Sequence, residues 1–189
     1  SSGFILSADS ICPDDIISAI DTSNANPSIT YLWIISPYAF ITDSSSDSTG
    51  ITFPNNVSGN TIIYTITLYI TDSITGYLDS TYQYVYVHSN PIALFSITTD
   101  ACGPDTLTPT NNSSFQDSCL WTVSSPSVGI SNDTACNPEF YFPENTGQID
   151  NTYIITLSVT TEFGCDSTIT DTVIIHPTPE VTFTASDTS

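Results

Sequence analysis

The chain contains one module twice, and this internal repeat constrains its fold more than any other feature. Three landmarks return 88 to 90 residues later, namely Cys12 as Cys102, Trp33 as Trp121 and His88 as His176. A unit of about 90 residues is long enough to bury a core of its own, unlike the shorter units of a solenoid. We therefore expect two self-contained modules, residues 1–89 and 90–177, followed by the start of a third at 178–189.

Within each module, apolar and polar residues alternate with period two, and no stretch shows the period of a helix. The pattern predicts seven short strands per module. In the first they cover residues 4–8, 15–20, 30–35, 39–42, 51–53, 61–70 and 81–87, and in the second 92–98, 105–110, 119–124, 128–131, 139–142, 152–160 and 166–175. Seven strands with polar turns are typical of an immunoglobulin-like sandwich of two sheets. The prediction is an all-β chain of two tandem sandwiches, with Trp33 and Trp121 buried on the third strands.

The chain has no lysine or arginine and carries 20 acidic residues, which give a formal charge of −20. It cannot neutralise phosphates, so nucleic acid and anionic membrane surfaces are excluded as direct partners. No apolar run reaches the length needed to span a bilayer, so direct membrane insertion is not expected.

Catalytic and metal-binding residues are few, and we expect neither an enzyme nor a cofactor. His88 and His176 stand where each module meets its linker and could each supply one ligand to a metal site between modules, or simply face solvent. Asp14-Asp15 and the loop from Asp43 to Asp47 offer oxygen ligands for calcium, but neither matches a calcium-binding loop. Solvated turns are the alternative. No cluster of His and Asp or nucleophile with a base is recognisable.

Five cysteines without Cys-x-x-Cys spacing predict disulfides, and hence an extracellular or cell-surface location. In the expected topology, Cys119 precedes the third strand of the second sandwich and Cys136 lies between the fourth and fifth. Both fall at the same pole, so we predict a Cys119–Cys136 bond within the second module.

The other three cysteines favour a bond between modules. Cys102 follows the first strand of its module, whereas Cys165 precedes the seventh at the opposite pole, about 20 Å away. A disulfide cannot bridge that distance. The favoured pair is therefore Cys12–Cys165, which would lock the hinge between modules and leave Cys102 for another copy. The alternative is Cys102–Cys165 within the second module, with Cys12 free.

Three tyrosines share the outer face of the strand at 81–87. Alternation that turns Val85 and Val87 inward places Tyr82, Tyr84 and Tyr86 outward, and Tyr69 and Ile63 on the neighbouring strand are expected to join them. Such a face could stack on surface glycans or contact identical filaments. The alternative is ordinary cross-strand pairing that stabilises the sheet.

Four segments, 120–126, 137–142, 153–159 and 164–168, resemble PKD-type repeats, which are immunoglobulin-like, and in particular those of large secreted or surface adhesins of gliding, type IX-secreting Bacteroidetes. The resemblance implies a non-catalytic stalk segment of a surface adhesin, whose partners are neighbouring repeats of the same chain. The rivals are a carbohydrate-binding accessory module of a secreted enzyme and a subunit that self-assembles into filaments or a surface layer. The Trp-Asp-Phe-Gly-Asp-Gly loop of many PKD domains is absent, because Ile-Ile-Ser follows Trp33.

The same resemblance implies O-glycosylation at Asp followed by Ser or Thr and an apolar residue. The candidate sites are Ser10, Ser73, Thr106, Thr134 and Thr172. In a chain this rich in Ser, Thr and Asp, accidental matches are the alternative.

Overall fold

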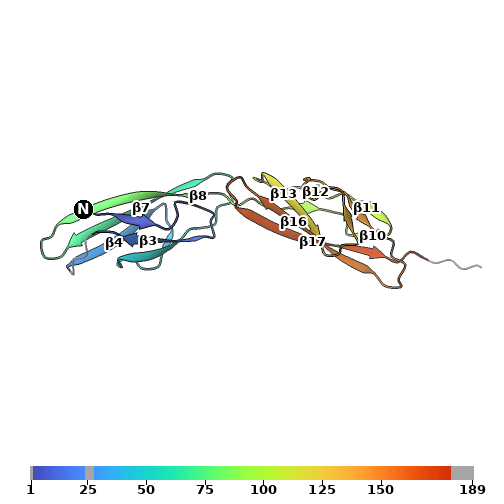
Figure 1. The fold of residues 1–189 in the computed structure, drawn as a ribbon, viewed down its shortest axis with the longest axis horizontal. Coiled ribbons are helices and arrows are strands. Elements are labelled where there is room, and N and C mark those ends of the chain that lie inside the picture. Colours follow the sequence, from blue (N-terminus) through green and yellow to red (C-terminus); the bar gives the residue numbers. More distant parts are fainter. Residues whose placement is uncertain (1, 24–27, 180–189) are drawn as a thin grey trace, which may run out of the picture. The chain divides into compact units, whose positions relative to one another are not determined.

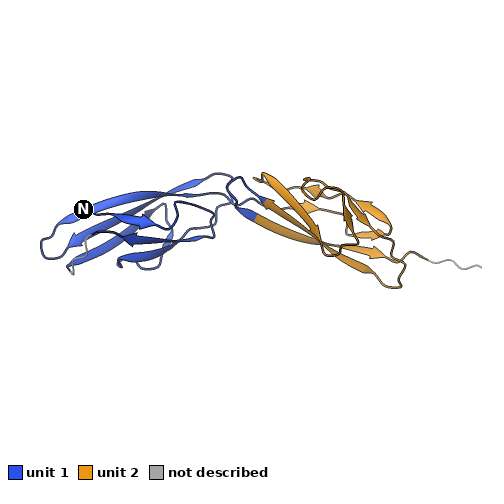
Figure 2. Cartoon of the chain, viewed as in Figure 1, with its two compact units in different colours: residues 1–92, 160–166 blue, residues 93–159, 167–189 orange. Residues whose placement is uncertain are grey.

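The computed structural model describes residues 2–23 and 28–179, and these residues form strands and connections without any helix. Among them, no helix is long and apolar enough to cross a membrane. The chain divides into two compact units, which are coloured separately in Figure 2. Unit 1 comprises residues 1–92 and 160–166, and unit 2 comprises residues 93–159 and 167–189. Most of the third module expected at 178–189 lies outside the described residues.

Unit 1 consists of two four-stranded sheets (Figure 1). One sheet has the order β1 (Phe4–Leu6), β3 (Ile16–Asp21), β6 (Ser48–Thr52), β5 (Phe40–Ile41) and is antiparallel throughout. The other has the order β2 (Ser10–Ile11), β8 (Leu78–Val87), β7 (Ile62–Asp72), β4 (Ile29–Ser36). Its long strands pair antiparallel, whereas the short β2 runs parallel to β8.

The core of unit 1 follows the period-two pattern of the long strands. Alternate residues of β7, from Tyr64 to Ile70, are buried, and Val85 and Val87 of β8 are fully buried, as the alternation predicts. Trp33 is 2% exposed and packs edge-on against Phe4, with ring centroids 5.1 Å apart. Its indole N–H donates to the carbonyl of Ser46 at 2.9 Å. The predicted burial of Trp33 is confirmed.

Unit 2 repeats this architecture around Trp121. One sheet has the order β10 (Asp100–Cys102), β17 (Asp166–His176), β16 (Asn151–Thr160), β13 (Ser118–Val123). The facing strands are β11 (Asp105–Leu107), β15 (Phe140–Phe142) and β14 (Gly129–Ile130), with β9 (Phe95–Ser96) pairing β12 (Thr110–Asn111). Trp121 is 1% exposed between the edges of Phe95 and Phe140.

Both units are thus immunoglobulin-like β-sandwiches, and the fold is all-β as predicted. The first strand of each module differs from the expectation, because it is split in two. After β1, the chain changes sheets and pairs as β2 with the last strand, β8. In unit 2, β9 and β10 divide in the same way, with β10 parallel to β17. The split places Cys12 and Cys102 at the end of the last strand.

Candidate functional site

One disulfide joins Cys12 to Cys165, which are 153 residues apart in sequence, with Cα atoms 5.5 Å apart. Cys12 directly follows β2, and Cys165 lies in the turn between β16 and β17. That turn, residues 160–166, belongs to unit 1 although its two strands belong to unit 2. The structure therefore forms the pair favoured by the sequence, and the alternative pair Cys102–Cys165 is absent.

A stacked ring pair accompanies the disulfide. The imidazole of His88 stacks on the ring of Phe163, with centroids 3.7 Å apart and planes at 4°. Its ring nitrogens are held by two hydroxyls, Nε2 by Ser10 Oγ at 2.8 Å and Nδ1 by Thr61 Oγ1 at 2.9 Å. His88 is only 7% exposed. We call Cys12 and His88, with Ser10 and Thr61, the first turn receptor.

The turn that this receptor holds has a backbone that requires glycine. Gly164 has φ of +84°, a left-handed conformation that side chains with a Cβ seldom adopt. The N–H of Gly164 donates to the carbonyl of Thr161, and the N–H of Thr161 donates to the carbonyl of Cys165. The sequence Phe163-Gly164-Cys165 therefore presents a ring and a sulfur from one tight turn.

Unit 2 carries the same pair of receptor residues, Cys102 and His176. Cys102 is a free, exposed thiol that lies opposite His176 in the parallel pairing of β10 and β17. The ring of His176 is held by two carboxylates, Nδ1 at 2.8 Å from Asp150 and Nε2 at 3.5 Å from Asp100. The hydrogen bond to Asp150 raises the pKa of His176 above its ordinary value, although desolvation opposes the shift. We call these four residues the second turn receptor.

The predicted Cys119–Cys136 disulfide is not formed, because both residues are free cysteines. The Cys136 thiol does lie close enough to Cys119 to contribute to a raised pKa of that residue, so the two cysteines come together as predicted, but the predicted bond between them is wrong. Cys119 is buried, and desolvation raises the pKa of its thiol to about 12. The thiolate is the form that attacks a disulfide, so Cys119 is a poor partner for exchange.

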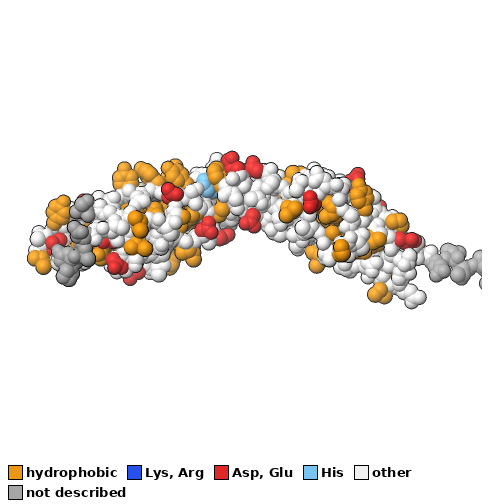
Figure 3. Space-filling model, in the orientation of Figure 1, with side chains coloured by type: hydrophobic (Ala, Val, Ile, Leu, Met, Phe, Trp, Pro, Cys, Tyr) orange, Lys and Arg blue, Asp and Glu red, His pale blue; other side chains and the backbone are white. Residues whose placement is uncertain are grey.

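The tyrosine face lies where the pattern placed it, on the outer face of the β4–β7–β8 sheet. Tyr82, Tyr84 and Tyr86 are 59%, 47% and 41% exposed, while Tyr69 is half-buried. The rings of Tyr82 and Tyr84 meet edge-on at 5.5 Å, and the phenol of Tyr82 raises the pKa of Tyr84. Ile63 is also exposed and lies opposite Tyr86 in the register, as expected. Figure 3 shows apolar side chains gathered along unit 1 near β8.

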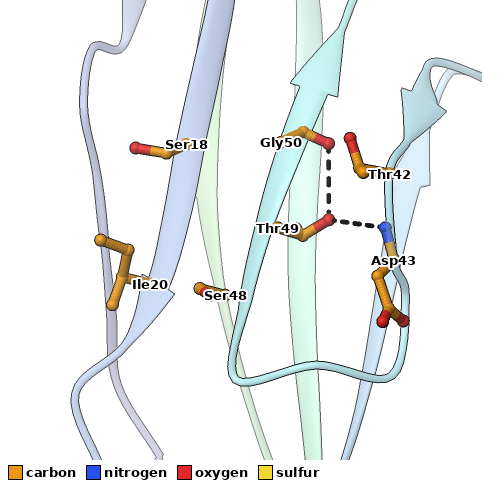
Figure 4. A pocket seen from close by; sticks show the side chains of 7 residues that line it. All are labelled: Ser18, Ile20, Thr42, Asp43, Ser48, Thr49 and Gly50. Carbon is orange, nitrogen blue, oxygen red and sulfur yellow. Dashed lines mark hydrogen bonds between the residues drawn. The ribbon is translucent and has the colours of Figure 1, made fainter.

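In the acidic loops, the carboxylates accept hydrogen bonds from nearby N–H and hydroxyl groups of the same turns. Asp43 accepts the N–H and hydroxyl of Ser45 at 2.8 and 2.7 Å, and the backbone bond lowers its pKa. Asp15 accepts the N–H of Cys12. A pocket beside Asp43, whose lining side chains are drawn in Figure 4, is lined otherwise by the hydroxyls of Ser18, Thr42, Ser48 and Thr49 and by Gly50 and Ile20. Within residues 2–23 and 28–179, no group of three or more His, Cys, Asp or Glu side chains is arranged to hold a metal ion.

All five candidate glycosylation residues are exposed, but three of their hydroxyls are engaged. Ser10 contacts His88, Ser73 donates to the carbonyl of Ser28 at 2.8 Å, and Thr134 donates to Asn132 at 2.9 Å. The backbone N–H groups of Thr106 and Thr172 donate to the carboxylates of the preceding aspartates at 2.7 Å.

Two features of the first turn receptor were not anticipated. The stacking of His88 on Phe163 had no signal in the sequence, because the residues are 75 positions apart and belong to different modules. The hydroxyls of Ser10 and Thr61 were likewise unremarkable in a chain rich in Ser and Thr. Only the return of His88 as His176 marked the position.

Comparisons with known proteins give remote likenesses only. No protein-family model matches the chain, and no curated protein matches it. Among solved structures, the D00–D0 domain of intimin is 15% identical, with 90% of this chain and 99% of that chain covered and a TM-score of 0.39. The Bacteroides ovatus mixed-linkage glucan utilization protein SGBP-B, solved with a mixed-linkage heptasaccharide, is 17% identical (88% and 42% covered, TM-score 0.35).

Mouse cadherin-23 EC22–24 is 12% identical, with 94% of this chain and 67% of that chain covered and a TM-score of 0.38. The chain spans less than half the length of the SGBP-B chain. At these identities and TM-scores, the likenesses assign neither a ligand nor an activity to this protein.

Proposed function

We propose that the chain is a non-catalytic stalk segment of a long extracellular repeat protein, of the PKD-like kind found in bacterial surface adhesins. The observation that carries this proposal is the Cys12–Cys165 disulfide, which ties the hairpin turn of the second repeat into unit 1. Disulfides persist in oxidising compartments, which supports a location outside the cytoplasm. The absence of lysine and arginine favours spacing and mutual repulsion over binding to anionic partners.

The disulfide changes the path that a pulling force takes through the chain. Force applied at the two termini passes from Cys12 to Cys165 through the sulfurs and bypasses the 152 residues between them. That bypassed segment includes Trp33, Trp121 and all strands from β3 to β16. Most of both cores is therefore protected from extension, as a stalk under tension would require.

Pulling single molecules by their termini tests this function. With the disulfide intact, only the 11 residues before Cys12 and the 24 after Cys165 can lengthen, a gain bounded at about 120 Å. In reducing buffer the whole chain can extend, to about 640 Å. Cys12→Ser should show the long extension in either buffer, whereas Cys136→Ser should behave like the parent.

A long extension of the oxidised parent chain would contradict the proposal. So would Cys12→Ser if it kept the short extension, since the bypass would then depend on some other link. Both results are read as lengths and need no assumption about the strength of either unit.

The tyrosine face favours glycan binding as a second candidate function. Aromatic rings exposed in a row can stack on sugar rings, and the matching positions in unit 2 are Thr170, Thr172 and Ile174. Binding on a glycan array that is lost in a Tyr82→Ser, Tyr84→Ser, Tyr86→Ser variant would support an accessory module. Ordered polymers that depend on the same residues would instead support filament contacts. If the protein shows neither glycan binding nor polymer formation, the tyrosine face acts only to stabilise the sheet.

A further inference from the structure

The two repeats present turn receptors that are equivalent residue by residue. In unit 1, β2 pairs parallel with β8, Ile11 opposite Val87, so that Cys12 comes beside His88. In unit 2, Ala101 lies opposite Ile175 and Cys102 opposite His176 in the same parallel register. Each short strand therefore places a cysteine beside the histidine at or just after the end of the last strand.

The groups that orient the histidine rings occupy equivalent positions, although they are hydroxyls in unit 1 and carboxylates in unit 2. Ser10 and Asp100 precede the receptor cysteines by two residues, and each contacts Nε2. Thr61 and Asp150 contact Nδ1, and each follows a residue whose carbonyl accepts the amide of a buried asparagine. Each imidazole is thus fixed at both nitrogens, which leaves its flat faces for stacking.

The two receptors differ in what covers them. The first holds the turn Phe163-Gly164-Cys165, through a ring stack and a disulfide, and His88 is 7% exposed. In the second, the side chain of His176 is 42% exposed and Cys102 is a free, exposed thiol. The occupied receptor therefore shows, within the same chain, what chemistry the second one accepts.

We infer that Cys102 and His176 form a docking site for a hairpin turn of the aromatic–Gly–Cys type, carried by another repeat of this kind. The aromatic ring stacks on His176, and the turn cysteine forms a disulfide with Cys102. Each bond formed removes two thiol protons and two electrons, which pass to a small-molecule or protein disulfide that is reduced to two thiols. This inference rests on the stalk function, because it extends the same link along an array.

The probe for this site is a synthetic peptide with the sequence of residues 158–168, whose cysteine is activated as a mixed disulfide with an aromatic thiol. Exchange with Cys102 breaks that S–S bond, forms the protein–peptide disulfide and releases the coloured aryl thiolate. The initial rate at each cysteine of the full chain is followed by the absorbance and assigned by peptide mapping. The matched control peptide carries Ala in place of the phenylalanine.

We expect the parent peptide to react with Cys102 roughly 2 to 10 times faster than the control, since a ring stack contributes about 0.5–1.5 kcal/mol. Cys136 is also exposed and free but lacks a neighbouring histidine receptor, so both peptides should react there at equal rates. His176→Ala should abolish the preference at Cys102, and His176→Tyr, which restores a flat ring, should retain it.

Equal rates for the two peptides at Cys102 would overturn the inference, as would an equal preference at Cys136 or a preference that survives His176→Ala. The result is independent of the pulling experiment, which reads the Cys12–Cys165 bond alone. If Cys102 shows no preference for the phenylalanine peptide but the oxidised chain keeps its short extension, only the docking site at the second turn receptor is refuted. If the oxidised chain shows the long extension but Cys102 keeps its preference for the phenylalanine peptide, the stalk function is refuted and the docking site stands.

Discussion

At the scale of single residues, the two core tryptophans have the same place in the fold but different polar contacts. Trp33 donates its indole N–H to Ser46, whereas the indole N–H of Trp121 is buried without a hydrogen-bond partner among the described residues. An unpaired buried N–H costs about 1–3 kcal/mol. The ring of Trp121 therefore stabilises unit 2 through its buried volume, against a polar cost that Trp33 does not have.

This difference predicts unequal effects for the same substitution. Trp33→Phe removes ring volume and also leaves the Ser46 carbonyl without its donor, whereas Trp121→Phe removes ring volume together with an unpaired donor. We expect Trp33→Phe to lower the free energy of unfolding by about 1–3 kcal/mol more than Trp121→Phe. Hydrogen exchange of the β7 amides reports unit 1, and that of the β16 amides reports unit 2. Equal losses in the two units would contradict the assignment.

At the scale of elements, a buried asparagine fixes the loop before the sixth strand of each module. Asn145, which is 2% exposed, donates to the carbonyls of Ile149 and Ile175 at 2.8 and 2.9 Å and accepts the N–H of Gly147 at 3.0 Å. Asn56 makes the same set of contacts with Asn60, Val87 and Ser58. The clamp ties the loop to the end of the last strand, next to the receptor histidine.

Asn145→Ala should destabilise unit 2 by at least about 2 kcal/mol, because it leaves buried backbone groups without partners. Asn132→Ala is the matched control, since Asn132 is exposed and its side chain accepts only from Thr134 in a surface turn. We expect less than about 0.5 kcal/mol there. Hydrogen exchange of the β16 amides, which reports unit 2, compares the two variants, and similar losses would refute the clamp.

The long strands could be predicted from the sequence, because alternation over ten residues determines which face is buried. Ile66 and Leu68 in the first module, and Ile155 and Leu157 in the second, stand at alternate positions of the predicted strands 61–70 and 152–160 and are fully buried. The split of the first strand could not be predicted from the sequence. The strands β2 and β10 have only two and three residues, and they depend on pairing with a distant strand. The asparagine clamp did leave a signal, Phe-Pro-x-Asn at both 53–56 and 142–145, but asparagine in a loop is normally exposed.

At the scale of the whole molecule, 20 acidic side chains act without lysine or arginine to balance them. Within the described residues, His176 pairs with the carboxylates of Asp100 and Asp150. We expect the thermal midpoint at pH 7 to rise as NaCl increases from about 0.01 to 0.15 M, because the screening length falls from about 30 to 8 Å. The rise should shrink at pH 3, where most carboxylates are protonated. A midpoint insensitive to salt at pH 7 would show that repulsion does not limit stability.

The disulfide also determines what a protease can achieve. A single backbone cut anywhere between Cys12 and Cys165 leaves two pieces that remain covalently joined through the sulfurs. Enzymes that cleave after lysine or arginine have no site at all in this chain. A nicked molecule therefore keeps its two ends connected, and a stalk built from such segments would be severed only where protease and reductant act together.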